Sequence, residues 1–413
     1  MKRSDNVNLG DMKVREKPDT LISSLKKLNL RSYTMILALL VIWGILTIMT
    51  DGTFLTPRNM SNLFRQGSVV AFIAIGMVLV VAAGQIDLSV GSLAGLTGAI
   101  VALLQVRWLP SLAEATGMTW IASGWPSTII AVLFAIVFGM LLGAWQGLWI
   151  AYGRVPAFIV TLGGLLIFRG SILGLTRGVN IAPLDPTLQL FGQAYLSPMV
   201  GAVLGGLAVV AILVFGYYSR MNKRKYGFPV RSLSHDVLII LVSCAATILF
   251  VVQMNRFRGI PVPVVILLCL TGLFTFIANR TQFGRHTFAI GGNIEAARLS
   301  GINIRRTMLW IYTVMGGLAG ISGVVLTARL NVATANAGNL FELNAIAACV
   351  IGGTSLAGGE GSIPGAIIGS LIMASIDNGM SLMNVESFWQ QIVKGFILMI
   401  AVLVDVNSRK VND

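Results

Sequence analysis

The chain has 413 residues, of which 55% are hydrophobic and only 11% are charged, against about 25% charged residues in an ordinary soluble domain. This composition excludes a soluble protein, because too little polar surface is available to keep the folded chain in solution. The net charge of +14 could indicate nucleic acid binding, but the positions of the basic residues explain it differently, as shown below. The 46 glycines fit helix packing in lipid, where small residues let backbones approach closely.

The N-terminal residues 1–32 are polar and mixed in charge, and we expect a cytoplasmic tail. The first apolar run extends from Tyr33 to Met49 and is followed by Asp51-Gly52-Thr53, which is not a small-x-small cleavage pattern. The sequence therefore predicts a retained first span and no cleaved signal peptide.

Twelve apolar segments follow one another along the chain, each long enough, or nearly so, to cross a bilayer. They lie at 33–50, 67–83, 89–104, 127–150, 156–175, 198–218, 236–252, 261–278, 308–327, 343–357, 363–377 and 388–404. Glycine and polar residues interrupt the pairs around 84–91 and 357–363, which favours broken or re-entrant helices and about ten to twelve full crossings. The prediction is an all-α polytopic membrane domain over 33–405, followed by a cytoplasmic tail at 406–413.

The basic residues indicate the orientation of this domain. If the N-terminus is cytoplasmic and all twelve segments cross, inner stretches contain 21 of the 30 Lys and Arg residues. The outer stretches contain seven, namely Arg58, Arg65, Arg107, Arg177, Arg256, Arg258 and Arg329. The positive-inside rule then places both termini in the cytoplasm. Anionic lipid headgroups explain the basic inner loops without a nucleic acid partner, and some outer arginines are expected to contact an external partner or the membrane interface.

The two interruptions resemble each other. Gly91-Ser92-Leu93-Ala94-Gly95 in the first aligns with Gly361-Ser362-Ile363-Pro364-Gly365 in the second, and a Val-x-x-Phe pattern follows each, at 155–158 and 385–388. Duplicated halves with interrupted helices are typical of transporters, and the alternative is two unrelated glycine-rich loops.

Small and polar residues in these interruptions are candidates for lining a pathway or for shaping the helix break: Asp87, Ser89, Gly91, Ser92, Gly353, Thr354 and Ser355. Asp87 either caps the helix that begins near Ser89 or lines the pathway, since a charge at membrane depth is costly and usually functional.

The loop at 279–307 carries five arginines and a single acid, Glu295. Asn293 can cap a short helix with Glu295 in its first turn, and Gly301 can end that helix. We expect a helix of about two turns on the cytoplasmic surface, which suits docking into a groove of a soluble partner.

Glu295-Ala296-Ala297, Gly301 and Ile304 form the pattern E-A-A-x-x-x-G-x-x-I, which resembles the EAA loop of ABC import permeases. The stretches Ala289–Ile302, Ile86–Ser92 and Ala347–Gly359 resemble the monosaccharide branch of that family. The resemblance covers about Leu55 to Asp405, and Ala374–Ser381 and Phe388–Gly395 are most similar to the D-xylose permeases.

This resemblance implies a transport subunit that forms the pathway of a sugar importer in a bacterial inner membrane. It implies a homodimer, separate ATP-binding subunits that clamp the helix around Glu295, and an external sugar-binding protein. ATP and Mg²⁺ would be bound by the partner, and no cofactor by this chain. Consistent with this, no GxxxxGK[ST] motif is present, so we expect neither ATP binding nor enzymatic activity.

Other chemistry finds little support in the sequence. Cys244, Cys269 and Cys349 lie in apolar runs, and His235 and His286 lie in predicted loops, so neither a disulfide framework nor a metal site is expected. No pair of intramembrane carboxylates suggests a proton relay. The alternatives are a permease of the same family for another monosaccharide or for an amino acid, an ion-coupled secondary carrier, and a membrane enzyme.

Two basic residues, Arg169 and Lys394, fall inside predicted spans. Each can reach the interface, bind carbonyl groups or pair with an acid such as Asp87. Asp377 is expected in a solvated loop at the external edge, and Trp389 as an interfacial aromatic anchor.

Overall fold

The structure is a computed structural model that describes residues 30–228 and 233–410. In chain order the helices are α2 (Leu30–Met49), η1 (Thr53–Leu55), α3 (Pro57–Ala82), α4 (Val90–Leu103), the π-helical η2 (Leu104–Trp108), α5 (Leu109–Thr116), η3 (Thr119–Ile121), α6 (Gly124–Ala151), α7 (Ala157–Thr176), α8 (Pro186–Gln193), α9 (Pro198–Lys225), α10 (Leu233–Asn255), α11 (Val262–Arg280), α12 (Gln282–Gly292), α13 (Ile294–Leu299), α14 (Ile304–Leu330), α15 (Phe341–Ile351), α16 (Ile363–Leu382) and α17 (Ser387–Lys410).

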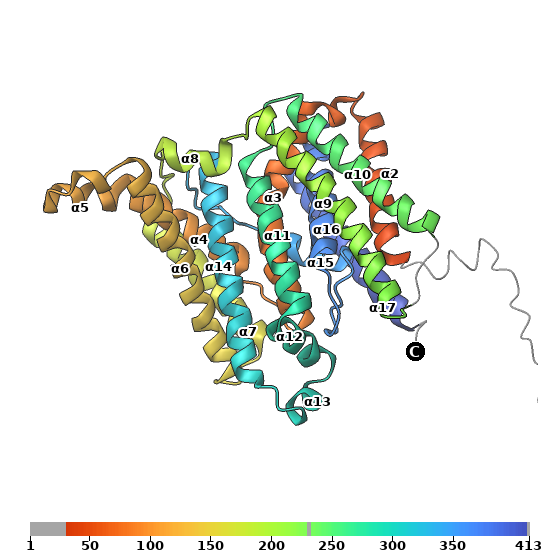
Figure 1. Cartoon of the computed structure of the whole chain (residues 1–413). Coiled ribbons are helices and arrows are strands. Elements are labelled where there is room, and N and C mark those ends of the chain that lie inside the picture. The colour runs from red at the N-terminus through yellow and green to blue at the C-terminus, as the bar shows by residue number, and fades with distance from the viewer. Residues whose placement is uncertain (1–29, 229–232, 411–413) are drawn as a thin grey trace, which may run out of the picture.

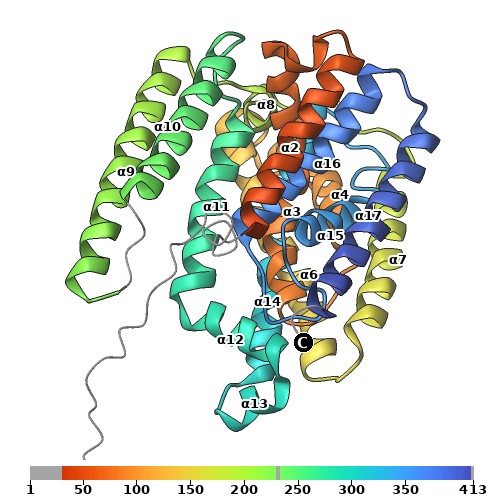
Figure 2. The ribbon, with the colours of Figure 1, turned by 90° about the vertical axis from the view of Figure 1, so that its right-hand side faces the viewer.

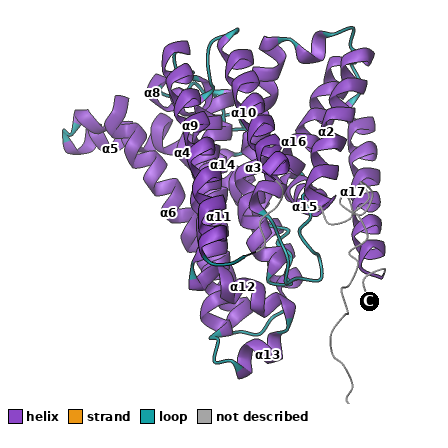
Figure 3. Ribbon diagram, turned by 45° about the vertical axis from the view of Figure 1, so that its right-hand side comes forward, coloured by secondary structure: helices purple, strands orange, loops and turns teal. Residues whose placement is uncertain are grey.

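Within the described residues, ten helical stretches are long and apolar enough to cross a membrane, and α2 and α15 contribute shorter apolar helices. Because lipid offers no hydrogen bonds to an exposed backbone, a segment that crosses it must satisfy its own backbone groups, as a helix does. Figure 3 shows a chain built of helices and loops, and the predicted all-α fold is confirmed. The predicted N-terminal tail lies almost wholly outside the described residues, while α17 continues to Lys410, past the boundary expected at 405.

Helix boundaries follow local signals. Proline occupies the first turn of α3, α8, α9 and α16, where its missing N–H costs nothing. The side chains of Asp185 and Ser362 accept hydrogen bonds from backbone N–H groups two and three residues ahead, and so begin α8 and α16.

The centre of the bundle is formed by α3, α4 and α14. In the most apolar windows of α3, of the stretch Val90–Thr116 that α4 begins, and of α14, 78%, 89% and 72% of the residues are buried, against 11% in α9 and α10. Figure 2 accordingly shows α9 and α10 as a pair at the edge of the bundle, beside α11. Their apolar surface is exposed in the isolated chain, as expected for helices that face lipid.

The tight contact between α6 and α14 depends on two glycine pairs. Gly139 and Gly143 on α6 face Gly316 and Gly320 on α14, and each pair is spaced four residues apart. A Cβ atom on Gly139 or Gly316 would meet the carbonyl oxygen of the other residue, so larger side chains would force the helices apart.

The bundle has two distinct ends (Figure 1). One end, called here the α8 end, carries α8 and the loop between α2 and α3, while the opposite α13 end carries α12 and α13. The segments between α3 and α4 and between α15 and α16 lie close to α12, and so belong to the α13 end. The bundle therefore brings the two interrupted regions to one end, next to the predicted surface helix.

Candidate functional site

The short helix α13 projects from its end of the bundle (Figures 1 and 3). Asn293 Oδ1 accepts a hydrogen bond from Ala296 N at 2.9 Å, and Gly301 takes a φ of +80°, which ends the helix. These observations confirm the predicted helix and its two ends.

The side chains of α13 divide into an anchor and an exposed face. Ala297 is only 4% exposed and fixes the helix to the protein, whereas the apolar Leu299 is 88% exposed. Glu295 and Arg298 form a surface ion pair at 3.4 Å, of a kind that contributes little to stability. An exposed leucine next to a pair of charges is suited to a partner's groove rather than to the fold itself.

The helix α12 connects this surface to both helix breaks. Gly359 N donates a hydrogen bond to Ala82 O at 2.9 Å, so the second break is joined directly to the end of α3. Gly291 lies against this contact, because a Cβ atom there would meet Ala82 O and would come within 2.7 Å of Gly359 N. The helix α12 therefore contacts the main chain of both breaks.

The candidate residues of the first break shape it from inside. Asp87 is 1% exposed and accepts hydrogen bonds from Ser89 N at 2.8 Å and Ser89 Oγ at 2.7 Å. Gln146 on α6 donates to the same Ser89 hydroxyl at 2.7 Å, and Ser92 Oγ donates to Ser89 O. Gly91 allows Glu342 of α15 to approach α4. Asp87 thus bonds to Ser89, which is itself the N-cap residue of α4, and the capping and pathway roles of Asp87 stay predictions.

The candidate residues of the second break lie in a loop that folds on itself. Gly353 takes a φ of +83°, and Thr354 and Ser355 are fully buried. Ser355 N donates to Glu360 O at 3.0 Å, and Gly358 N donates to Ser355 O at 3.0 Å. Their predicted role along the pathway is not tested by these contacts.

The aligned residues of the two predicted repeats differ in their helical positions. Ser362 is the N-cap of α16, whereas Ser92, with which it aligns, lies within the first turn of α4, whose N-cap is Ser89. Each Val-x-x-Phe pattern leads into a helix, α7 or α17, as expected. However, the elements from α4 to α6 precede the first pattern and α16 alone precedes the second, so the repeat stays a prediction.

The intramembrane basic residues have partners other than Asp87. Arg169 donates to the carbonyl oxygens of Ala335 and Ala337 and, at 2.7 Å, to Asn339 Oδ1. Lys394 Nζ lies 3.3 Å from Asp377 Oδ1. Asp377 is four-fifths buried within α16, so the expectation of a solvated loop position was wrong.

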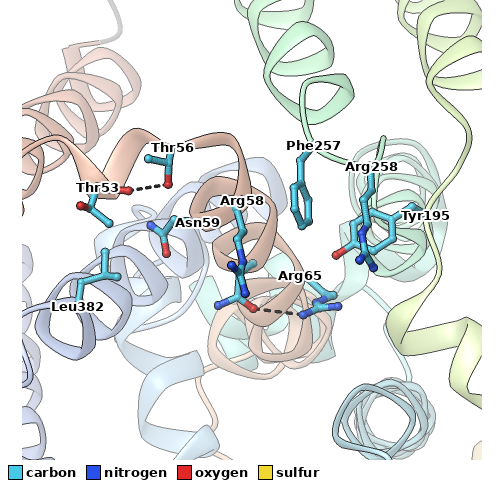
Figure 4. A pocket seen from close by; sticks show the side chains of 10 residues that line it. Thr53, Thr56, Arg58, Asn59, Arg65, Tyr195, Phe257, Arg258 and Leu382 are labelled. Carbon is cyan, nitrogen blue, oxygen red and sulfur yellow. Dashed lines mark hydrogen bonds between the residues drawn. The ribbon is translucent and has the colours of Figure 1, made fainter.

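The α8 end contains a basic pocket of about 600 Å³ (Figure 4), called here the outer pocket. Arg58, Arg65 and Arg258 line it, with Tyr195 and Phe257 beside them. The guanidinium groups of Arg65 and Arg258 lie 6.0 and 5.9 Å from the centre of the Tyr195 ring. Sequence reasoning placed these arginines outside the span interiors, but missed their convergence because they are far apart in the chain.

An all-helical bundle of membrane-length helices, with two interrupted regions joined to a projecting surface helix, defines a multi-pass membrane permease. The family model described as "Branched-chain amino acid transport system / permease component" matches residues 59–403, and the chain belongs to this family.

Several curated proteins match over nearly the whole chain. The xylose transport system permease protein of Haemophilus influenzae is 46% identical over 94% of this chain and 99% of the relative. The xylose transport system permease protein of Escherichia coli is 43% identical over 94% of this chain and 95% of the relative. The ribose import permease protein of Bacillus subtilis is 34% identical over 89% and 90%. No solved structure gives a significant match.

Proposed function

We propose that this chain is the permease subunit of an ATP-driven, binding-protein-dependent sugar importer with D-xylose as its substrate. The observation that carries the proposal is the 46% identity to a xylose permease over 94% of this chain, against 34% to a ribose permease. The protein binds no cofactor itself in this proposal and performs no covalent chemistry.

The energy source is a separate ATP-binding subunit that docks on α13 and the turn after it. Glu295, Ala296, Gly301 and Ile304 contribute to this coupling region, and the buried Ala297 holds the helix in place. Three features support it: the chain lacks a P-loop, Leu299 is exposed on α13, and α12 contacts both helix breaks. ATP and Mg²⁺ are bound by that subunit, and its closure on ATP moves α13 and α12 together.

Two copies of the chain assemble around the pathway, with the α13 end and both termini in the cytoplasm of a bacterial cell. The distribution of basic residues supports this orientation, since 21 of 30 fall in the stretches assigned to the inside. The outer pocket then faces the periplasmic or extracellular sugar-binding protein, which delivers the solute.

Transport by a reconstituted assembly tests the proposal. The chain, its ATP-binding subunit and its sugar-binding protein are placed in liposomes, and uptake of labelled D-xylose, D-ribose and L-leucine is measured with and without ATP. We expect ATP-dependent uptake of xylose in preference to the other two solutes. Preference for ribose would show that the substrate is another monosaccharide, and preference for leucine would favour the alternative of an amino acid permease. Accumulation by the chain alone, driven by an ion gradient, would overturn the coupling to ATP.

A further inference from the structure

A small cavity lies inside the bundle, between α3, α14, α15 and α16, and is called here the polar cavity. Its volume is about 120 Å³, which corresponds to about four water molecules at their share of liquid volume. Its lining includes the polar side chains of Gln66, Arg329, Asn344, Ser370 and Asp377, together with the ring of Phe341.

Three polar atoms around this cavity are buried and accept or donate no hydrogen bond within the described part of the chain. They are Ser370 Oγ, Arg329 Nε and Asp377 Oδ1, the last of which has only its ion pair with Lys394. Ser370 is 2% exposed. Because buried polar groups in proteins are nearly always hydrogen-bonded, such a cluster indicates that another molecule completes it.

The chemistry of the lining selects the class of that molecule. Amide groups such as those of Gln66 and Asn344 both donate and accept, and a serine hydroxyl does the same. A guanidinium and a carboxylate are both present, so the lining does not favour a ligand of one charge. Sugar hydroxyls match mixed donors and acceptors, and the Phe341 ring offers a face for the C–H groups of a sugar ring.

The polar cavity adjoins a second, smaller cavity. Asn344 and Met373 line both, and the smaller cavity reaches Lys394 on α17. Gln66 of the polar cavity follows Arg65 of the outer pocket along α3, but these two spaces share no lining residue. The two inner cavities are therefore neighbours, and the outer pocket is a separate space.

We propose that the polar cavity in each copy is a transit site that opens to the pathway between the two copies and takes an uncharged, polyhydroxylated solute. There a sugar exchanges hydrogen bonds to water for hydrogen bonds to Ser370, Asn344, Gln66 and Asp377. This inference rests on the proposed function and adds a location within the permease. The site favours solutes by their hydroxyl groups, independently of the binding protein.

Substitutions in the reconstituted importer test the site. Ser370→Ala and Asn344→Leu should each lower xylose uptake per ATP hydrolysed by about three- to tenfold, the loss expected for one or two hydrogen bonds. Ser375→Ala is the matched control, because Ser375 lies on the same helix and is buried, but donates to Leu371 O, accepts from Trp43 Nε1 and does not line the cavity.

The outcomes separate the two proposals. If the wild-type assembly shows no ATP-dependent sugar uptake, the proposed function fails. If it transports xylose and the cavity variants do so equally well, or lose no more than the Ser375 variant, only the transit site fails.

A protection experiment reads the site without relying on transport. Ser370→Cys is made in a chain whose Cys244, Cys269 and Cys349 are replaced by alanine, and its labelling by a small thiol reagent is followed in the reconstituted assembly with and without D-xylose. We expect D-xylose to slow the labelling of the Ser370→Cys variant, and L-leucine to leave its labelling rate unchanged. Protection by leucine alone, no protection by either solute, or a thiol that no reagent reaches would overturn the transit site, since such a site must open to water.

Discussion

At the level of single residues, Gly291 is the position where a side chain would do most damage. A Cβ atom there meets the main chain of Ala82 and Gly359, neither of which can rotate away, whereas a Cβ atom on the adjacent Gly292 has its nearest neighbour 3.9 Å away. The two residues have the same helical setting and differ in this contact.

We predict that Gly291→Ala lowers the free energy of unfolding by about 1–3 kcal/mol, as overpacking does, and uncouples ATP hydrolysis from transport. Gly292→Ala should leave both properties close to wild type. Thermal melting of the purified chain measures the first effect, and xylose uptake per ATP hydrolysed by the assembly measures the second. Equal behaviour of the two variants would contradict the contact between α12 and the breaks.

Asp185 makes the start of α8 sensitive to acid. Its carboxylate accepts hydrogen bonds from Thr187 N, Thr187 Oγ1 and Gly124 N at 2.6 to 2.8 Å. Partial burial raises the pKa of this carboxyl, but the hydrogen bonds from Thr187 and Gly124 outweigh burial and leave the pKa below its ordinary value. The stabilisation is therefore complete above the ordinary pKa and is lost as the pH falls through the lower folded-state pKa.

We predict that Asp185→Ala lowers stability at neutral pH by about 1 kcal/mol, the usual value of an N-cap. Asp185→Asn keeps the cap to Thr187 but cannot titrate, so its melting temperature should fall less than that of the wild type between about pH 5 and about pH 3. Parallel melting curves of wild type and Asp185→Asn over this range would show that the carboxylate does not carry the acid sensitivity.

At the level of elements, α13 is defined by local signals and can be altered without disturbing the bundle. Leu299 is 88% exposed, so Leu299→Asp should change the free energy of unfolding by less than about 0.5 kcal/mol. We predict that the same change strongly reduces binding of the ATP-binding subunit, which co-purification measures. Gly301→Pro should have a similar effect, because proline cannot adopt the φ of +80° that ends the helix.

A matched control for α13 is Ser300→Ala, since this residue is exposed and its hydroxyl donates a hydrogen bond to Ala296 O of its own helix. If the Leu299→Asp variant still binds the ATP-binding subunit as the wild type does, α13 is not part of the docking surface.

The contrast between α12 and α13 shows what the sequence can predict. The cap at Asn293, the acid at Glu295 and the stop at Gly301 lie within nine residues, so the short helix is readable from the chain. The contact that gives α12 its importance joins Ala82, Gly291 and Gly359, which lie far apart in the sequence. Only the folded bundle brings them together.

At the level of the whole molecule, composition and apolar segments were sufficient to predict an all-α membrane domain, because lipid leaves few other folds available. The polar cavity was not predictable in the same way. Its lining comes from four helices. The sequence suggests a loop position for Asp377, because the ion pair with Lys394 is apparent only once α17 lies next to α16. Hydropathy reports burial in lipid, and it does not report which buried groups face one another.

The orientation of the molecule gives a further prediction. In a chain without its native cysteines, Thr53→Cys at the α8 end and Ser300→Cys on α13 place single exposed thiols at opposite ends. An impermeant maleimide should label position 53 in intact cells and position 300 only after the membrane is opened, as the distribution of basic residues requires. The reverse pattern would invert the topology and exclude docking of a cytoplasmic ATPase on α13.

The hydrogen bond between Ala82 O and Gly359 N has a consequence for genetics. Both atoms belong to the main chain, so no side-chain substitution removes this bond by itself, and alanine at Gly291 or Gly359 acts through a steric clash instead. A backbone ester at position 359 is the chemical change that removes the donor and spares every side chain. Mutational maps of such proteins can therefore report crowding at the junction that unites their two halves without reporting the strength of its hydrogen bond.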